Sequence, residues 1–188
     1  MEVSFPTFLE TFSLLNFTRL MAEDTEPTFR VDVSSRPILI HIHGRANFLN
    51  CSPLRTFFRT MADKGLRDFL LDFTDCQGMD STFLGILAGV AIEARRGNSN
   101  GSIQLSGLDA RNLELVNNLG LHRIVTIVET SAVDSALDSP EAEGLSEEVQ
   151  TEEQKKEMLI GAHEDLVKID NTNLERFQDL LTFLKNEE

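Results

Sequence analysis

The feature that most constrains the fold is a nearly continuous apolar run in the middle of the chain. The segment LRDFLLDFTDC, residues 66–76, brings Phe69, Leu70, Leu71 and Phe73 close together in sequence. A run of this kind is typical of a β-strand covered on both faces, since a strand with one face in water alternates apolar and polar side chains. The segment therefore predicts a buried strand within a sheet.

Strand-like and helix-like segments alternate before this run. Thr28–Ser35 and Pro37–Ala46 are typical of a hairpin or a close pair of strands. The segment CSPLRTFFRTMADKG then predicts a helix, with Ser52 as its N-cap, Pro53 at the first helical position and Gly65 where the helix ends.

The alternation continues after the run. A helix is expected from Ser81 or Thr82, followed by the short strand GSIQLSG, a helix capped by Asp109 and a last strand at Ile124–Glu129. The order β β α β α β α β over about residues 28–129 predicts an α/β fold, with helices laid on a mixed sheet.

Composition divides the chain into four parts. Residues 28–133 form the α/β domain, residues 134–146 an acidic linker, and residues 147–188 a pair of helices. Residues 1–27 form an N-terminal arm with two readings, an apolar arm or sequence upstream of a natural start at Met21, and the second is favoured.

The two C-terminal helices are amphipathic and need a surface to cover their apolar stripes. Thr172 and Glu175 predict a capping box at the start of the second helix. The apolar positions are Leu159, Ala162, Leu166, Ile169, Leu174, Phe177, Leu181 and Leu184. The pair is expected to pack on its own domain or on a second copy of the chain. A sharper alternative is that it docks on the domain and gates access to Ser81.

Charge and cysteine content argue against several classes of partner. The formal net charge of −14 disfavours nucleic acid and anionic membrane surfaces. Cys51 and Cys76 have no metal-binding spacing and fit a cytoplasmic protein with reduced thiols. No apolar run reaches about 18 residues, so no membrane span is expected.

Ser81 follows Asp80 at the junction of the buried strand and the next helix. A serine at that position commonly caps the helix, because the first backbone amides of a helix lack partners. The same position suits a phosphoserine, since amides such as those of Phe83 and Leu84 and the helix dipole can receive phosphate oxygens. Both roles stay open.

The stretch LLDFTDCQGMDSTFLGILAG and the order of elements resemble the STAS domain of bacterial anti-sigma-factor antagonists, which carry a DSSGLG-like motif between a buried strand and a helix. The residues on that motif are Asp72, Asp80, Ser81, Leu84 and Gly85. NNLGLHRIVTIVE resembles the closing helix, turn and strand of the family. The resemblance covers about Thr28 to Glu129 and implies a STAS-like mixed β-sheet covered by helices, with a C-terminal helical extension.

The resemblance also implies a non-enzymatic role in signal transduction and transcription regulation. In that family a partner serine kinase, which is also the anti-sigma factor, phosphorylates this serine and thereby releases the antagonist. Ser81 is then the phosphoacceptor. The partner is expected to contact Arg45, Asn47, Phe48, Asp80, Thr82 and Phe83. Members of the family also serve as scaffold subunits of stress-sensing or lipid-transport assemblies, so a scaffold in which Ser81 is only a cap is the second hypothesis.

The motif departs from the family where Thr82 and Phe83 replace a small pair of residues. Phe83 has two readings, a core residue or an exposed partner contact, and the core is favoured. Gly85 and Gly89 form a narrow stripe of small residues, which is expected to allow close packing on the sheet.

Catalytic and metal chemistry find little support in the sequence. Met79 and Phe83 occupy the positions of the glycines in a nucleophile elbow, which disfavours Ser81 as a nucleophile. No feature selects a base among the four histidines, His41, His43, His122 and His163. His41 and His43 share a strand face, but no third ligand is evident, so neither a metal nor another cofactor is expected.

Overall fold

The computed structural model describes residues 28–96, 101–128, 142–146 and 149–186. The N-terminal arm expected over residues 1–27 and most of the expected acidic linker lie outside these residues. Within the described ranges, no helix has the length and apolar character needed to cross a membrane.

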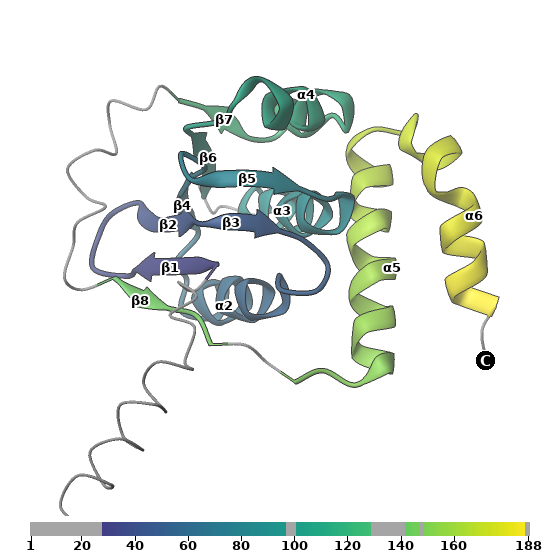
Figure 1. Ribbon diagram of the computed structural model, residues 1–188, viewed down its shortest axis with the longest axis horizontal. Helices are drawn as coiled ribbons and strands as arrows, with labels where there is room; N and C mark the ends of the chain where they lie inside the picture. The colour runs from purple at the N-terminus through teal and green to yellow at the C-terminus, as the bar shows by residue number, and fades with distance from the viewer. Residues whose placement is uncertain (1–27, 97–100, 129–141, 147–148, 187–188) are drawn as a thin grey trace, which may run out of the picture.

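A six-stranded mixed sheet organises the domain, in the order β7–β6–β4–β2–β1–β8 (Figure 1). Its strands are β1 (Phe29–Asp32), β2 (Ile38–Ile42), β4 (Asp68–Asp72), β6 (Ser102–Ser106), β7 (Thr126–Ile127) and β8 (Glu143–Gly144). β1 is antiparallel to β2 and β8, whereas β2, β4, β6 and β7 are parallel neighbours. The predicted α/β class with a mixed sheet is confirmed.

The helices of the domain are α2 (Ser52–Asp63), α3 (Ser81–Ala94), α4 (Ala110–Asn118) and the short 3-10 helix η1 (Leu121–Arg123). Phe58 of α2 packs edge-on against Phe69 of β4, with ring centroids 4.9 Å apart. Phe83 of α3 contacts the rings of Phe29 and Phe73. Aromatic contacts thus hold α2 and α3 to one face of the sheet.

The central strand β4 is less symmetric than its apolar run suggests. Phe69 and Leu71 point toward the helices and are fully buried, whereas Leu70 on the opposite face is only partly buried. Asp72 also lies on that opposite face and is fully buried. The expectation of a strand covered on both faces is therefore met at Asp72 and only partly met at Leu70.

Two short strands outside the main sheet were not predicted. β3 (Gly44–Ala46) pairs in parallel with β5 (Cys76–Met79) to form a separate two-stranded ribbon. Neither strand shows apolar alternation, so periodicity does not separate β3 from β2 or distinguish β5 from a loop. The last strand begins later than the expected Ile124, because the amides of Ile124 and Val125 still donate to the Leu121 carbonyl of η1.

Three helix starts test the capping predictions. Asp109 caps α4 as expected, accepting a hydrogen bond from the Asn112 amide at 2.7 Å. Ser52 was wrong as an N-cap: it lies within the first turn of α2, and Cys51 holds the cap position without a side-chain hydrogen bond. At the start of the second C-terminal helix, where Thr172 and Glu175 were expected to form a capping box, the Thr172 hydroxyl donates a hydrogen bond to Asp170.

The C-terminal helices are α5 (Glu152–Ile169) and α6 (Asn173–Asn186). α5 begins with a capping box formed by Thr151 and Gln154, and its residues Met158, Ala162 and Leu166 join the main core. Figure 1 shows α5 standing between the sheet domain and α6. The helices therefore pack on their own domain, which is one of the two arrangements expected for them.

Small residues let α5 approach α3 closely. A side-chain Cβ at Gly85 would collide with the backbone of Ala162, and one at Gly89 would collide with the carboxylate of Asp165. The glycine stripe was expected to face the sheet, and that expectation was wrong, because the stripe receives a helix from the C-terminal segment. The segment expected as a linker also contributes β8, which pairs with β1.

Candidate functional site

The β3–β5 ribbon brings two segments of the sequence together at the start of α3. Ala46 at the end of β3 pairs with Met79 at the end of β5, and the Asp80 amide donates to the Ala46 carbonyl at 3.2 Å. The loop that begins at Asn47 therefore lies beside the first turn of the helix that begins at Ser81.

Asp80 is the residue that fixes this junction. Its extended backbone, with φ −113° and ψ 174°, places it at the N-cap of α3, where its Oδ1 accepts from the Phe83 amide at 2.9 Å. Its Oδ2 accepts from the Phe48 amide at 2.7 Å. Asp80 therefore caps the helix and ties the loop to it, and the reading of Ser81 as the cap was wrong.

Asp80 also accepts hydrogen bonds from two backbone amides in the first turn of α3. The Phe83 amide donates to the Asp80 side chain, and the Leu84 amide donates to the Asp80 carbonyl at 3.2 Å. These two amides were the ones expected to receive phosphate oxygens. In this conformation both already have partners, so a phosphate on Ser81 would have to be held by other groups.

The loop from Asn47 to Asn50, called the Phe48 loop below, is held in shape by hydrogen bonds of its own side chains. Asn47 Oδ1 accepts from the Leu49 amide at 2.9 Å, and Asn50 donates to the Arg45 carbonyl at 2.7 Å. Arg45 is exposed, Asn47 and Phe48 are partly buried, and Leu49 has 86% of its surface exposed. Leu49 was not among the residues expected to contact a partner, although the sequence places it beside Phe48 and between two asparagines, Asn47 and Asn50.

Two of the residues expected to contact a partner lie in the interior. Phe83 is completely buried between the rings of Phe29 and Phe73, and Thr82 is also buried. The first turn of α3 directs these side chains into the core, because α3 is covered on one side by the sheet and on another by α5. The core reading of Phe83 holds, and neither residue can touch a partner in this conformation.

Ser81 contacts His163, a residue of α5 that lies 82 positions later in the chain. Its Oγ lies 3.0 Å from Nε2 of His163 on α5, and His163 Nδ1 lies 2.8 Å from the Leu159 carbonyl. A carbonyl oxygen only accepts, so Nδ1 carries a proton, and in the neutral ring Nε2 accepts the hydroxyl hydrogen of Ser81. His163 is buried and packs edge-on against Phe177 of α6.

The structure thus selects His163 among the four histidines as the neighbour of Ser81. A serine and a histidine in this geometry can act as nucleophile and base when a substrate reaches them. A cavity of about 600 Å³ lies between α2, α3 and α5, and one of about 130 Å³ lies beside the Phe48 loop. Neither cavity is lined by Ser81 or His163, so neither brings a substrate to the pair.

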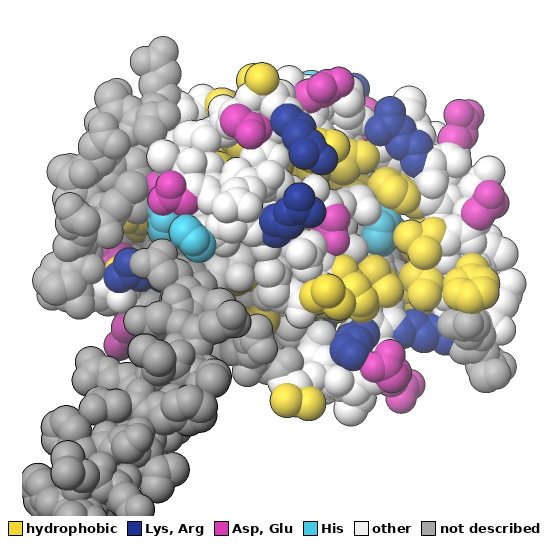
Figure 2. All heavy atoms as spheres, in the orientation of Figure 1, with side chains coloured by type: hydrophobic (Ala, Val, Ile, Leu, Met, Phe, Trp, Pro, Cys, Tyr) yellow, Lys and Arg dark blue, Asp and Glu magenta, His cyan; other side chains and the backbone are white. Residues whose placement is uncertain are grey.

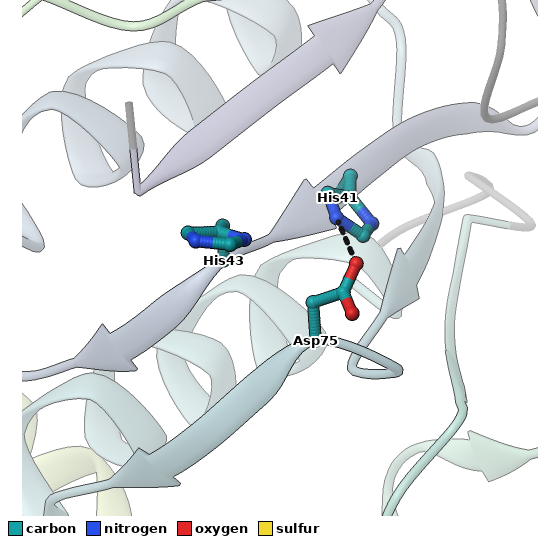
Figure 3. A group of neighbouring side chains, drawn as sticks. All are labelled: His41, His43 and Asp75. Atoms are coloured by element: carbon teal, nitrogen blue, oxygen red, sulfur yellow. Dashed lines mark ion pairs between the residues drawn. The ribbon is translucent and has the colours of Figure 1, made fainter. Parts of the chain in front are cut away.

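A second polar cluster lies at the other end of the β3–β5 ribbon (Figure 3). His41 Nδ1 lies 3.0 Å from the buried carboxylate of Asp72, and its Nε2 lies 3.1 Å from Asp75. The hydrogen bond to Asp72 raises the pKa of His41, although burial opposes it. Burial raises the pKa of Asp72, but hydrogen bonds from His41 and Thr74 outweigh it and hold that pKa below its usual value.

Comparison with known proteins places most of this domain in one family. A protein-family model described as "Mlab, STAS domain" matches residues 29–129. No curated protein matches the chain.

Solved structures show distant likeness to the same region. The unphosphorylated anti-sigma factor antagonist SpoIIAA is 17% identical, with a TM-score of 0.47, covering 58% of this chain and 98% of that one. The phosphorylated form of SpoIIAA from Bacillus is 18% identical, with a TM-score of 0.46, covering 57% of this chain and 97% of that one. A candidate anti-sigma factor antagonist from Thermotoga maritima is also 18% identical, with a TM-score of 0.46, covering 59% and 94%.

Proposed function

Because the chain belongs to the STAS domain family described as Mlab, we propose that it is a protein-interaction module whose binding is controlled by phosphorylation of Ser81. Its partner is a serine kinase that also acts as an anti-sigma factor. The observation that carries the proposal is the position of the Ser81 hydroxyl, half-buried at the first residue of α3 and beside the loop that begins at Asn47. A modification there changes a surface while the core stays in place.

The partner surface consists of Arg45, Asn47, Phe48 and Leu49, with Asp80 and Ser81 at its edge. Arginine and aromatic side chains are enriched in protein interfaces, and an exposed leucine at a loop tip adds an apolar contact. Asp80 holds the loop against the helix through the Phe48 amide. The loop is therefore presented in one fixed conformation, which lowers the entropy lost on binding.

Phosphorylation of Ser81 would break the contact with His163. The phosphoryl group replaces the hydroxyl hydrogen, so Oγ loses the hydrogen bond that it donates to Nε2 over 3.0 Å. The phosphate also adds about 1.5 to 2 negative charges close to the Asp80 carboxylate. The unmodified chain therefore binds its partner, and the phosphorylated chain releases it because the charge of the surface changes.

The test is affinity capture from the host with four forms of the full chain: wild type, Ser81→Ala, Ser81→Asp and the control Thr182→Asp. Thr182 lies exposed on α6, so its replacement adds a charge away from the loop. A regulated module retains the same partner with wild type, Ser81→Ala and Thr182→Asp, and loses it with Ser81→Asp. Equal recovery with Ser81→Ala and Ser81→Asp would exclude control through Ser81.

A scaffold subunit is the second candidate, because Ser81 already has a structural partner in His163 and the cap belongs to Asp80. Its contact surface is α6. Leu174, Leu180 and Phe183 of α6 are exposed, and Figure 2 shows hydrophobic side chains gathered over this part of the molecule. Leu181 is buried instead, so it is not an external contact. Loss of the captured protein with Phe183→Asp, and indifference to both Ser81 variants, is the result that favours a scaffold.

A further inference from the structure

Three potential metal ligands converge where β2 ends and the turn before β5 begins (Figure 3). His41 lies on β2, His43 follows that strand, and Asp75 directly precedes β5. One ligand atom from each of the three side chains lies within 4.8 Å of the others. Asp75 is the third ligand that the sequence does not reveal, because it lies more than thirty positions from the histidines, at the same sheet edge.

The orientation of His41 is set by a buried acid. Asp72 is completely buried, its Oδ2 lies 3.0 Å from His41 Nδ1, and its Oδ1 accepts from the Thr74 hydroxyl at 2.7 Å. When the proton shared with Asp72 is on Nδ1, Nε2 of the neutral ring offers its lone pair toward Asp75. Histidines that bind metals commonly have such a carboxylate behind them, which orients the ring and increases its basicity.

The charge balance favours a cation between Nε2 and Asp75. Nε2 and a carboxylate oxygen of Asp75 lie 3.1 Å apart, and a positive charge between them, carried by a ring proton or by a metal ion that displaces it, stabilises this arrangement. Asp72 and Asp75 contribute two negative charges. Arg30, which pairs with His41 across β1 and β2, contributes one positive charge on the same sheet face. The cluster keeps an excess of negative charge.

We propose that His41 Nε2, a ring nitrogen of His43 and the Asp75 carboxylate bind a divalent transition metal of the zinc class. Two imidazoles and one carboxylate form a donor set that suits Zn²⁺, with a fourth position left for water or for a group from a partner. Asp72 is a positioning residue that acts through His41.

Metal binding at this position would stabilise the ribbon that carries the Ser81 site. The Gly44 amide donates to the Asp75 carbonyl at 3.0 Å, which is the first link between β3 and β5. A metal held by His43 and Asp75 joins the same two segments just before the strands begin. Loss of the metal would therefore loosen the ribbon, whose strands end at Ala46 and Met79.

The test is isothermal titration of Zn²⁺ into the full chain, without a histidine tag and after treatment with a chelator. Wild type is expected to bind one Zn²⁺ per chain and to melt at a higher temperature with the metal, because a ligand that binds only the folded state stabilises it. His43→Gln and Asp75→Asn are expected to weaken binding by more than about tenfold and to abolish the thermal shift, since even outer-shell losses cost about 10- to 100-fold.

Matched controls are His122→Gln and Asp179→Asn, which remove an exposed histidine and an exposed carboxylate elsewhere on the surface. Both controls are expected to bind Zn²⁺ like wild type. The proposal is overturned if wild type shows no saturable binding, in which case a proton on His41 supplies the positive charge. It is equally overturned if His43→Gln and Asp75→Asn bind as tightly as the controls.

Discussion

At the scale of single residues, the main result is the separation of two roles that the sequence placed on Ser81. Asp80 caps α3 and holds the Phe48 loop, and Ser81 donates to His163. A sequence with an aspartate and a serine side by side at a helix start does not tell which residue is the cap, because both types favour that position. Backbone conformation decides it: Asp80 is extended and Ser81 is helical.

This assignment predicts unequal costs for two alanine substitutions. Asp80→Ala removes the cap and leaves the Phe48 amide without its partner, so a loss of about 1 to 3 kcal/mol in the free energy of unfolding is expected. Ser81→Ala removes one hydrogen bond and leaves Nε2 of the buried His163 without that partner, so it is expected to cost less than Asp80→Ala, about 1 kcal/mol. Urea unfolding followed by far-UV circular dichroism measures both. A larger loss for Ser81→Ala than for Asp80→Ala would contradict the assignment of the cap.

A second prediction at this scale concerns Cys51. Burial, and next the negative charge of Asp80, raise the pKa of its thiol to about 12. The thiolate is the reactive form, so Cys51 of the folded protein should react very slowly with iodoacetamide at neutral pH and faster only as the pH approaches that pKa. Mass spectrometry of the alkylated peptides, with urea-unfolded protein as the reference, gives the rates. Rapid labelling of folded Cys51 would show that the thiol is accessible and ionised.

At the scale of elements, the packing of α5 on α3 depends on the absence of side chains. Gly85→Ala places a methyl group against the Ala162 backbone, and overpacking of this kind costs about 1 to 3 kcal/mol. Gly161→Ala is the matched control, because it lies on α5 with nothing within 4 Å of the added methyl group. The control is expected to stabilise the protein by about 0.5 to 1 kcal/mol through helix propensity.

Urea midpoints of the two alanine variants measure this difference directly. Equal stability changes for Gly85→Ala and Gly161→Ala would mean that α5 does not lie against α3 in solution. The comparison is informative because both substitutions are the same chemical change, made on one helix or the other of the same contact.

The elements also show what the sequence could predict. The main strands and the helices of the domain follow from apolar periodicity and from Asp109, Pro53 and Gly65 at helix ends. The β3–β5 ribbon and β8 could not be predicted as separate strands, because their residues show no alternation of apolar and polar side chains. Tertiary pairing makes them, through Gly44 with Asp75 and through β8 with β1.

The candidate site was predictable only in its local part. The resemblance to a family motif pointed to Asp80 and Ser81, and to the Phe48 loop with Arg45 just before it. His163 lies 82 positions after Ser81, and no local pattern links the two residues. The proposed role of Asp75 as a metal ligand could not be predicted from the sequence either, since its distance from the histidines depends on how β2 and β4 pair.

At the scale of the whole molecule, α5 belongs to the core of the domain. Leu166 is completely buried within it, so Leu166→Ala is expected to cost about 2 to 5 kcal/mol. Leu174 on α6 is exposed and its replacement by alanine should change stability by less than about 0.5 kcal/mol. Urea unfolding should show a single transition both for wild type and for Leu166→Ala. Two separate transitions in the wild-type chain would show that α5 is an independent unit.

For the whole molecule we propose that Ser81 is a regulated phosphorylation site. Mass spectrometry of the Ser81 peptide, from protein isolated from its own host during growth and under stress, tests it most directly. We expect a phosphate on Ser81 whose occupancy changes between the two conditions. A well-observed Ser81 peptide that carries no phosphate in either condition would contradict it and leave Ser81 as a structural partner of His163.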